Sequence, residues 1–191
     1  MIRQARVEDL EQIEEAYNEH FAHEQTHTAY TIFKRGIYPT RQTATDALNE
    51  GALHVYENDG QIAGSIIVNE KMPPEYARVP WSVAGRALVI HLLMVRPRMT
   101  GKGVASALVA HAFGLARERS CASVRLDTGS QNAPAVALYT KLGFRITASG
   151  SMQVGGAVPH AAHLFLERAV DTACRPSEPQ KAPASAGQKE A

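Results

Sequence analysis

The sequence predicts an α+β domain in which helices flank a mixed central β-sheet. Strand-like and helix-like patterns alternate along the chain, which is typical of this class. Residues 88–95 form a nearly continuous apolar run, as in a strand that is buried on both faces. Residues 58–60 read Asn-Asp-Gly between two apolar segments, which is typical of a β-hairpin turn. With 191 residues, of which 45% are hydrophobic, the chain suits one domain with a substantial core.

The first half of this domain is expected to contain two helices and the hairpin. Apolar residues recur at helical spacing near the start of the chain, which predicts the first helix. Thr40 suits the N-cap of the second helix, and Gly51 suits its end. The expected elements are a strand at 2–5, a helix at 7–20, a helix from Thr40 through Leu48, and strands at 53–57 and 62–68.

The second half is expected to begin with a long loop, because residues 71–86 carry three prolines and Gly85. An amphipathic helix follows the central strand, with its small and apolar residues on one face. The expected elements are a strand at 88–95, a helix at 103–119, a strand at 124–126, a helix at 134–142, and strand pieces near Ile146 and at 164–166.

The end of the chain differs in composition from the rest. Residues 171–191 contain three prolines and five alanines, but no Leu, Ile, Val, Met or aromatic residue. Such a segment cannot offset its ordering entropy by burying apolar surface. The folded domain is therefore expected at residues 1–170, and a disordered Pro/Ala-rich tail at 171–191.

Composition and charge exclude several classes of function. Lys plus Arg number 20 against 19 for Asp plus Glu, so the net charge of +1 gives no electrostatic footprint for nucleic acid or for an acidic membrane. No stretch approaches the roughly 20 apolar residues of a membrane span, and the first residues do not resemble a secretory signal. Cys121 and Cys174 are too far apart in sequence to indicate a metal site or a disulfide framework. We expect a cytoplasmic protein without a metal and without a nucleic-acid or membrane partner.

A glycine-containing loop follows the central strand and leads into a helix. Residues 100–106 read Thr-Gly-Lys-Gly-Val-Ala-Ser. Glycines allow backbone N–H groups to converge, and the helix start adds unpaired donors and a positive dipole end, so the segment suits a pyrophosphate. The alternative is a tight strand-to-helix turn with no ligand. A P-loop is excluded because Arg96 stands where its first glycine belongs, and a dinucleotide fingerprint is disfavoured because its third glycine is replaced by Ser106.

A second motif follows about 30 residues later. It begins with Asn132 and Ala135 and continues with Leu138-Tyr139-x-Lys141-x-Gly143-Phe144. This motif, together with the glycine loop, resembles the GCN5-related N-acetyltransferase (GNAT) superfamily. The resemblance implies a splayed central sheet, acetyl-CoA as cosubstrate and an amine as acceptor. The sequence departs from the family at Thr100, where Arg or Gln is usual.

The resemblance also implies positions for the coenzyme. The strand end would pair with the pantetheine arm through its backbone, the glycine loop would hold the pyrophosphate, and the helix after the next strand would contact the arm again. The residues so implied are Leu93, Met94, Val95, Thr100, Gly101, Lys102, Gly103, Val104, Ala105, Ser106, Asn132 and Tyr139.

Three residues are candidates for catalysis. Tyr139 matches the tyrosine that commonly protonates the departing thiolate, and a phenol is a suitable donor to a thiolate. His91 matches a proton-relay histidine of some family members, and imidazole titrates near neutrality. Asp127 matches a carboxylate base of other members. Each also has a structural interpretation: a buried aromatic, a hydrogen-bonded core histidine and a strand-end carboxylate, respectively.

The sequence thus predicts an acetyl-CoA-dependent N-acetyltransferase in which the amine attacks the thioester directly in a ternary complex. A non-catalytic acyl-CoA-binding regulatory module of the same fold is the alternative, and a longer acyl chain stays open. The acceptor is expected to be a small-molecule amine or a peptide N-terminus. Family relatives are often homodimers, and the sequence leaves the oligomeric state open.

Overall fold

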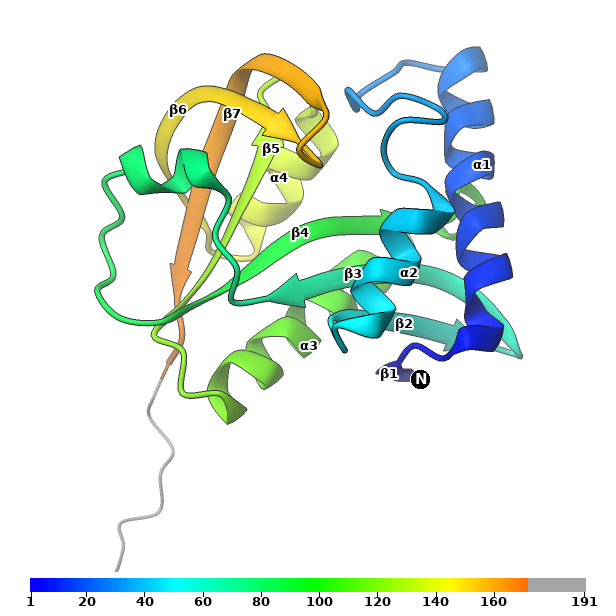
Figure 1. Ribbon diagram of the computed structural model, residues 1–191, viewed down its shortest axis with the longest axis horizontal. Helices are drawn as coiled ribbons and strands as arrows, with labels where there is room; N and C mark the ends of the chain where they lie inside the picture. Colours follow the sequence, from blue (N-terminus) through cyan, green and yellow to red (C-terminus); the bar gives the residue numbers. More distant parts are fainter. Residues whose placement is uncertain (172–191) are drawn as a thin grey trace, which may run out of the picture.

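The computed structural model describes residues 1–171, which form a seven-stranded sheet with helices on both faces (Figure 1). The α-helices are α1 (Leu10–Thr26), α2 (Arg41–Asn49), α3 (Val104–Glu118) and α4 (Ala133–Lys141). The strands are β1 (Ile2–Gln4), β2 (Leu53–Asn58), β3 (Gln61–Asn69), β4 (Ala87–Val95), β5 (Ser123–Gly129), β6 (Arg145–Val154) and β7 (Val158–Ala169). Short 3-10 helices are η1 (Val7–Asp9), η2 (Pro74–Arg78) and η3 (Pro97–Met99). Apart from Asp171, the predicted tail at 171–191 lies outside the described residues, as does Cys174.

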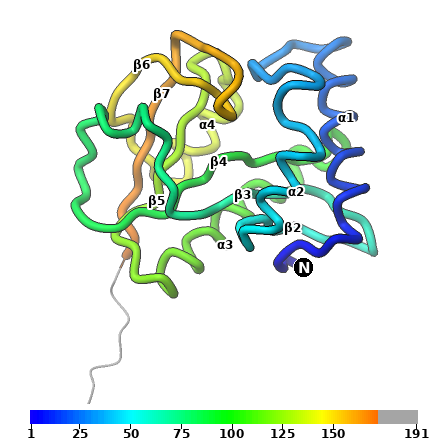
Figure 2. Tube along the Cα trace, viewed as in Figure 1, coloured from blue at the N-terminus to red at the C-terminus, as the bar shows by residue number. Residues whose placement is uncertain are grey.

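The sheet is mixed, as the sequence predicts. Its strand order is β1-β2-β3-β4-β5-β7-β6, and every neighbouring pair is antiparallel except β4 and β5. The parallel pairing runs only from Ala87–Ser123 to Ile90–Leu126. Beyond that point β4 and β5 diverge from their common start, as Figures 1 and 2 show. The backbone of the second half of β4 is therefore open on the side that β5 leaves.

Strand β4 contains a bulge close to this divergence. Leu92 pairs with Ile67 of β3 and Ile90 pairs with Val68, so His91 has no opposite residue on β3. An extra residue of this kind bends a strand and reorients its side chains. The bulge therefore gives His91 an orientation that a regular strand would not allow.

Each face of the sheet has its own core. Buried side chains of α1 and α2 pack on one face with residues of β2, β3 and β4, and buried side chains of α3 and α4 pack on the other. Tyr17 and Ile13 are fully enclosed in the first core, and Leu108 and Leu126 in the second. Both faces of the sheet are thus covered by packed side chains. The sheet itself is incomplete at the gap where β4 and β5 diverge.

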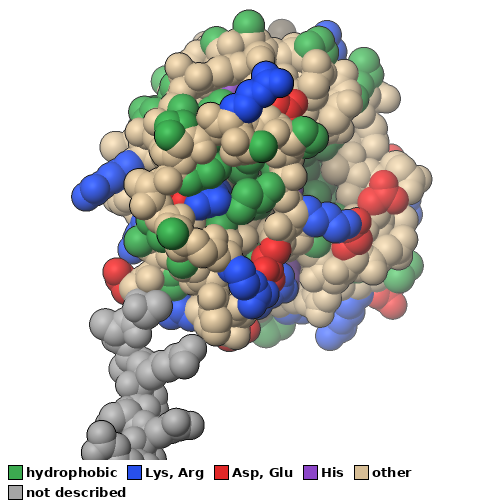
Figure 3. All heavy atoms as spheres, turned by 60° about the vertical axis from the view of Figure 1, so that its left-hand side comes forward, with side chains coloured by type: hydrophobic (Ala, Val, Ile, Leu, Met, Phe, Trp, Pro, Cys, Tyr) green, Lys and Arg blue, Asp and Glu red, His purple; other side chains and the backbone are tan. Residues whose placement is uncertain are grey.

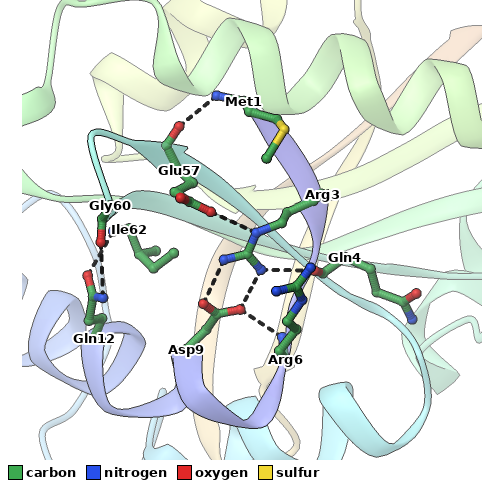
Figure 4. A network of polar contacts seen from close by, with 9 residues as sticks. All are labelled: Met1, Arg3, Gln4, Arg6, Asp9, Gln12, Glu57, Gly60 and Ile62. Carbon is green, nitrogen blue, oxygen red and sulfur yellow. Dashed lines mark hydrogen bonds and ion pairs between the residues drawn. The ribbon is translucent and has the colours of Figure 1, made fainter.

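A polar network fixes the first strand and the first helix to the hairpin (Figure 4). Arg3 donates to both carboxylate oxygens of Asp9, at 2.7 and 2.8 Å, and to Glu57 at 2.8 Å. Gln12 of α1 accepts from the N–H of Ile62 at 2.9 Å. Since these residues come from β1, α1 and the β2–β3 hairpin, the network closes this edge of the domain.

Most expected elements are confirmed, and three predictions are wrong in extent. The strand expected at 124–126 runs from Ser123 to Gly129, so Asp127 lies within it and not at its end.

The first helix, expected at 7–20, begins at Leu10 after a 3-10 turn and ends at Thr26. Ala22, Glu24 and Gln25 favour this extension as good helix formers, although the residues after Phe21 lack apolar spacing. The strand pieces near Ile146 and at 164–166 are parts of a long hairpin of β6 and β7. Its pairing with β5 is long-range, so local patterns do not reveal its length.

No helix within residues 1–171 combines the length and apolar character needed to cross a membrane. On the face shown in Figure 3, Lys and Arg side chains are interspersed with Asp and Glu side chains, in keeping with the net charge of +1.

Candidate active site

Two cavities meet at the point where β4 and β5 separate. The narrow cavity has a volume of about 130 Å³ and lies between the two strands and α4. The wide cavity has a volume of about 530 Å³ and is bounded by α2, the segment before η2 and the β6–β7 turn. Three residues line both: His91, Asp127 and Val154. The two cavities are therefore adjacent, and a histidine and a carboxylate lie at their common boundary.

The bulge residue His91 is held by Asn69. Its Nε2 lies 2.7 Å from Asn69 Oδ1, which also accepts from the backbone N–H of Lys71 at 2.9 Å. Because an amide oxygen only accepts, Nε2 carries the hydrogen and Nδ1 is left with a lone pair. Burial lowers the pKa of His91 from its usual value, an effect that the charge of Asp127 partly opposes. The imidazole is thus neutral near pH 7 and able to accept a proton.

Asp127 binds two side chains on the other side of the junction. Its Oδ1 accepts from the hydroxyl of Tyr76, and its Oδ2 lies against Nδ1 of His163, both at 2.9 Å. The register of β5 and β7 explains the second contact, because Gly129 is opposite His163 two residues beyond Asp127. Both carboxylate oxygens are therefore fixed in direction by buried partners.

Tyr139 is the buried residue of α4, and its side chain lines the narrow cavity. Its ring packs edge-on against Phe144, with ring centroids 5.6 Å apart. The hydroxyl makes no hydrogen bond to any of residues 1–171. Burial, together with the charge of Asp127, raises the pKa of Tyr139, so the phenol keeps its proton at neutral pH.

Two further predicted residues also line the narrow cavity. Asn132 is the N-cap of α4, where its side chain accepts from the N–H of Ala135 at 3.3 Å. Leu93 lies on the open stretch of β4. The backbone N–H of Arg96 donates to the carbonyl of Ala63 on β3. In an antiparallel ladder, successive residues point their backbone groups alternately toward the neighbouring strand and away from it. The backbone groups of Leu93 and Val95 therefore point away from β3 and toward the gap.

The glycine loop presents a row of free backbone donors. Gly101 and Gly103 have φ values of +78° and +82°, a conformation that favours glycine. Within the described chain, five N–H groups of this segment make no backbone hydrogen bond: Gly101, Gly103, Val104, Ala105 and Ser106. The N–H groups of Thr100 and Lys102 are used within the loop, by Pro97 and Met99. Such a row at the start of a long helix is suited to an anion.

Carboxylates predominate among the charged residues of the wide cavity. Asp46, Glu50, Glu75 and Asp127 line it, together with one lysine, Lys71. The ammonium of Lys71 already pairs with Glu50 at 2.6 Å. The charges of the residues that line this cavity are therefore negative in sum, which suits a cationic molecule.

The structure brings His91, Leu93, Asp127, Asn132 and Tyr139 together around one cavity. Met94, Val95 and the loop at 100–106 lie outside its lining, further along the same strand and at the start of α3. Sequence reasoning missed His163 and Tyr76. The His-x-x-His pattern of residues 160–163 was visible, but only the pairing of β7 with β5 places one of these histidines beside Asp127.

Comparison with known proteins agrees with this geometry. Residues 9–144 match the model of the acetyltransferase (GNAT) family. Streptothricin acetyltransferase of Streptomyces lavendulae is 30% identical over 105 residues, which are 55% of this chain and 50% of that protein. The 5-NmdU N-acetyltransferase of Pseudomonas phage PaMx11 is 30% identical over 100 residues, which are 52% of this chain and 61% of that protein. The chain thus matches only about half of the length of these relatives.

A solved structure extends the likeness to almost the whole domain. The Salmonella typhimurium protein yncA, solved with its cofactor acetyl-CoA, superposes with a TM-score of 0.64 at 21% identity. The superposition covers 92% of this chain and 96% of that one, and it shows the shared fold. Since the family model matches well over half of the sequence, the chain belongs to the GNAT family of acetyltransferases.

Proposed function

We propose that the protein transfers an acetyl group from acetyl-CoA to a primary amine. The observation that carries this proposal is the meeting of the two cavities at His91 and Asp127, where the sheet opens. The thioester would lie in the narrow cavity and the amine would enter through the wide one. Holding the two together accounts for much of the expected rate enhancement.

Three features of the chain support acetyl-CoA as the donor. The free N–H groups from Gly101 to Ser106 suit its pyrophosphate. The open backbone of Leu93 and Val95 suits its amide-containing arm, and Asn132 lies at the other wall of the cavity. The N–H of Leu93 is the donor we assign to the thioester carbonyl, where negative charge develops during attack. The backbone groups of Met94 point toward β3, where they take part in strand pairing. The contact with the thioester carbonyl is therefore assigned to Leu93.

His91 is the group we assign to deprotonate the incoming ammonium. A protonated amine has a pKa near 10 and cannot attack until it loses a proton. Nδ1 of His91 has a lone pair, the ring is neutral near pH 7, and His91 lines the cavity that the amine enters. The proton can then leave through the wide cavity.

Asp127 is the other candidate base, and its contacts favour a different role. Both of its oxygens are held by buried groups, Tyr76 and His163. A carboxylate fixed in this way suits the attraction of the ammonium to the junction. We therefore assign Asp127 to charge stabilisation and His91 to the first proton transfer.

Tyr139 is the proton donor we assign to the leaving thiolate. Its raised pKa keeps the phenol protonated, and its hydroxyl lines the narrow cavity without a partner in the described chain. A thiol of pKa near 8.5 leaves more readily when it receives a proton as the C–S bond breaks.

The acceptor is proposed to be a small amine or a peptide N-terminus that carries positive charge. The carboxylates Asp46, Glu50 and Glu75 support a cationic acceptor. The two curated relatives are named for acetylation of streptothricin and of 5-NmdU, which favours a small molecule.

Thiol release from acetyl-CoA tests this function. The purified protein is incubated with acetyl-CoA and a panel of amines, amino acids, aminoglycosides and peptides, and acetyl-CoA binding is measured separately by calorimetry. Acceptor-dependent release is the expected result. Binding without release for every acceptor class would favour the regulatory module, and absence of binding would contradict the role of the glycine loop.

A further inference from the structure

The wide cavity has a mostly apolar wall. Four of its apolar side chains come from the loop before α2, from β3 and from β6, and they are Tyr38, Ile67, Met152 and Val154. Each of the four keeps between 6% and 8% of its surface exposed. Because these side chains line the cavity without being sealed, a molecule inside it can touch them.

Two residues of β6 extend this wall outward from the junction of the two cavities. Val154 lines both the narrow and the wide cavity, so it lies at the junction. Met152 lines the wide cavity and an adjoining open groove of about 410 Å³, so it lies further out. Side chains two residues apart on a strand share a face and are roughly 7 Å apart. The wall along β6 is therefore long enough to cover a chain of several methylene groups.

Ile67 and Tyr38 continue the apolar wall close to the proposed base. Ile67 of β3 is opposite Leu92, which directly follows His91 in β4. The hydroxyl of Tyr38 lies 3.4 Å from the carbonyl oxygen of His91. The ring of Tyr38 packs so closely on Gly155 that a Cβ there would collide with it. An amine at His91 therefore has an aliphatic and an aromatic side chain near it.

The charged side chains are distributed differently from this wall. Asp46 and Glu50 are exposed residues of α2, and Lys71, which pairs with Glu50, is exposed as well. Glu75 is half-buried and accepts from a backbone N–H of β6 at 3.0 Å. Asp127 is the carboxylate that lines both cavities. Exposed carboxylates can attract an ammonium from solvent, and the charge of Asp127 is the one at the junction.

We propose that the acceptor is a primary amine with an apolar alkyl or aryl body. Its ammonium lies at the junction beside His91 and Asp127, and its body packs against Ile67, Met152 and Val154. In a cavity of this kind, the buried body supplies the affinity and the few polar groups fix the orientation. The hydroxyl groups of a sugar-like amine would be left unpaired against the apolar wall, which is unfavourable. This assignment rests on the proposed acetyl transfer and narrows its acceptor.

Straight-chain alkylamines from ethylamine to hexylamine test the assignment on the wild-type protein. Each has an ammonium of the same charge with a pKa near 10, so only the apolar body changes along the series. We expect kcat/KM for thiol release to rise about fourfold for each methylene that the wall buries, which corresponds to about 0.8 kcal/mol. Amino alcohols in which a hydroxyl replaces the terminal methyl group are the matched control and should be much poorer acceptors. A flat series, or amino alcohols that equal their alkylamines, would overturn the proposal.

Met152→Gln tests the wall itself, because glutamine is similar in length to methionine but has a polar end. For hexylamine, kcat/KM should fall about tenfold through a higher KM, the size expected when one to two buried methylene groups lose their contact. Ethylamine is too short to extend from the junction to residue 152, so its kcat/KM should stay within about twofold. Met72→Gln is the control variant, because Met72 is an exposed methionine that lines neither cavity, and it should leave both amines unchanged. Equal losses for hexylamine and ethylamine in folded Met152→Gln would contradict the role of this wall.

The same assays separate this proposal from the proposed function. Thiol release with aminoglycosides or amino acids but not with alkylamines would uphold acetyl transfer and overturn the apolar acceptor. Wild-type protein that releases no thiol with any amine would contradict acetyl transfer itself. Where Met152→Gln fails to fold, the alkylamine and amino alcohol series on the wild type still decides.

Discussion

Ile90 and Leu126 form the last pair of the parallel ladder between β4 and β5, and the residue after each of them lines both cavities. His91 and Asp127 therefore occupy equivalent positions on the two sides of the opening. The backbone beyond Ile90 loses its partner strand at the same point. One break in the sheet thus brings together an open strand edge, a neutral histidine and a fixed carboxylate.

Replacement of the Tyr139 hydroxyl should separate catalysis from binding. Tyr139→Phe keeps the ring that packs on Phe144 but removes the proposed proton donor, so we expect kcat to fall by about 10²-fold while acetyl-CoA affinity stays unchanged. Steady-state kinetics and calorimetry measure the two quantities. Tyr56→Phe is the control, because Tyr56 lines neither cavity. Unchanged turnover in Tyr139→Phe would remove this residue from the reaction.

The pH dependence of kcat/KM should report His91. In the proposed mechanism its neutral form is the active one, and burial lowers its pKa below the usual 6.5, so kcat/KM should rise with pH and reach half of its plateau below pH 6.5. His91→Gln should lower the plateau and abolish this rise. His23→Gln, an exposed position near the end of α1, is expected to keep the wild-type profile. A rise that persists in His91→Gln would assign the titration to another group.

Gly155 and Gly156 offer a matched pair at the β6–β7 turn. Both have positive φ, at +59° and +71°, so alanine strains either one. A Cβ on Gly155 would collide with the ring of Tyr38, which lines the wide cavity, whereas a Cβ on Gly156 would meet open space. In Figure 2 the loop before α2 reaches toward this turn.

We therefore expect Gly155→Ala to raise the KM for the amine several-fold more than Gly156→Ala and to lower stability further. Each alanine should cost roughly 1 kcal/mol of strain, and the difference between the two variants reports the displaced Tyr38 ring. Thermal unfolding and steady-state kinetics measure both effects. Equal KM values for the amine and equal thermal stability in the two variants would show that the Tyr38 ring can move aside without affecting either quantity.

A pair of contacting histidines, of which His54 is buried, should make stability depend on pH. Nδ1 of His54 lies 3.0 Å from Nε2 of His111, and burial lowers the pKa of His54 to about 4. The unfolded chain binds this proton near pH 6.5, so the free energy of unfolding should fall as pH decreases from 6.5 to 4. The loss from His54 is at most about 3 kcal/mol, at about 1.36 kcal/mol per pKa unit.

Urea unfolding at pH 7.5 and pH 4.5 measures this effect. His54→Gln is expected to be less stable than the wild type at pH 7.5 but to lose less stability on acidification. An identical pH dependence in the wild type and the variant would place the acid sensitivity elsewhere.

The parts of the fold with local signals could be predicted from sequence. The Asn-Asp-Gly turn, the Thr40 cap and the apolar run of β4 each depend on residues close in sequence, and all three are present. The glycine loop was also predictable, since its donors follow from two glycines and a helix start. Cytoplasmic location and a homodimer stay predictions.

The missing parts depend on long-range pairing. His163 lies beside Asp127 only because β7 pairs with β5, and the bulge at His91 depends on the register between β3 and β4. Nothing in residues 145–154 alternates strongly enough to reveal a ten-residue strand. The residues with coenzyme motifs were therefore accessible to sequence reasoning, but the partners that orient them were not.

Initial-rate kinetics in which acetyl-CoA and an amine acceptor are both varied test the central claim most directly. Direct attack at the junction of the two cavities requires both substrates to be bound together. Double-reciprocal plots should therefore give intersecting lines, and thiol release should depend on the acceptor. Parallel lines would indicate a covalent acetyl-enzyme, and thiol release independent of the acceptor would show that no amine meets the thioester; either result would contradict the account.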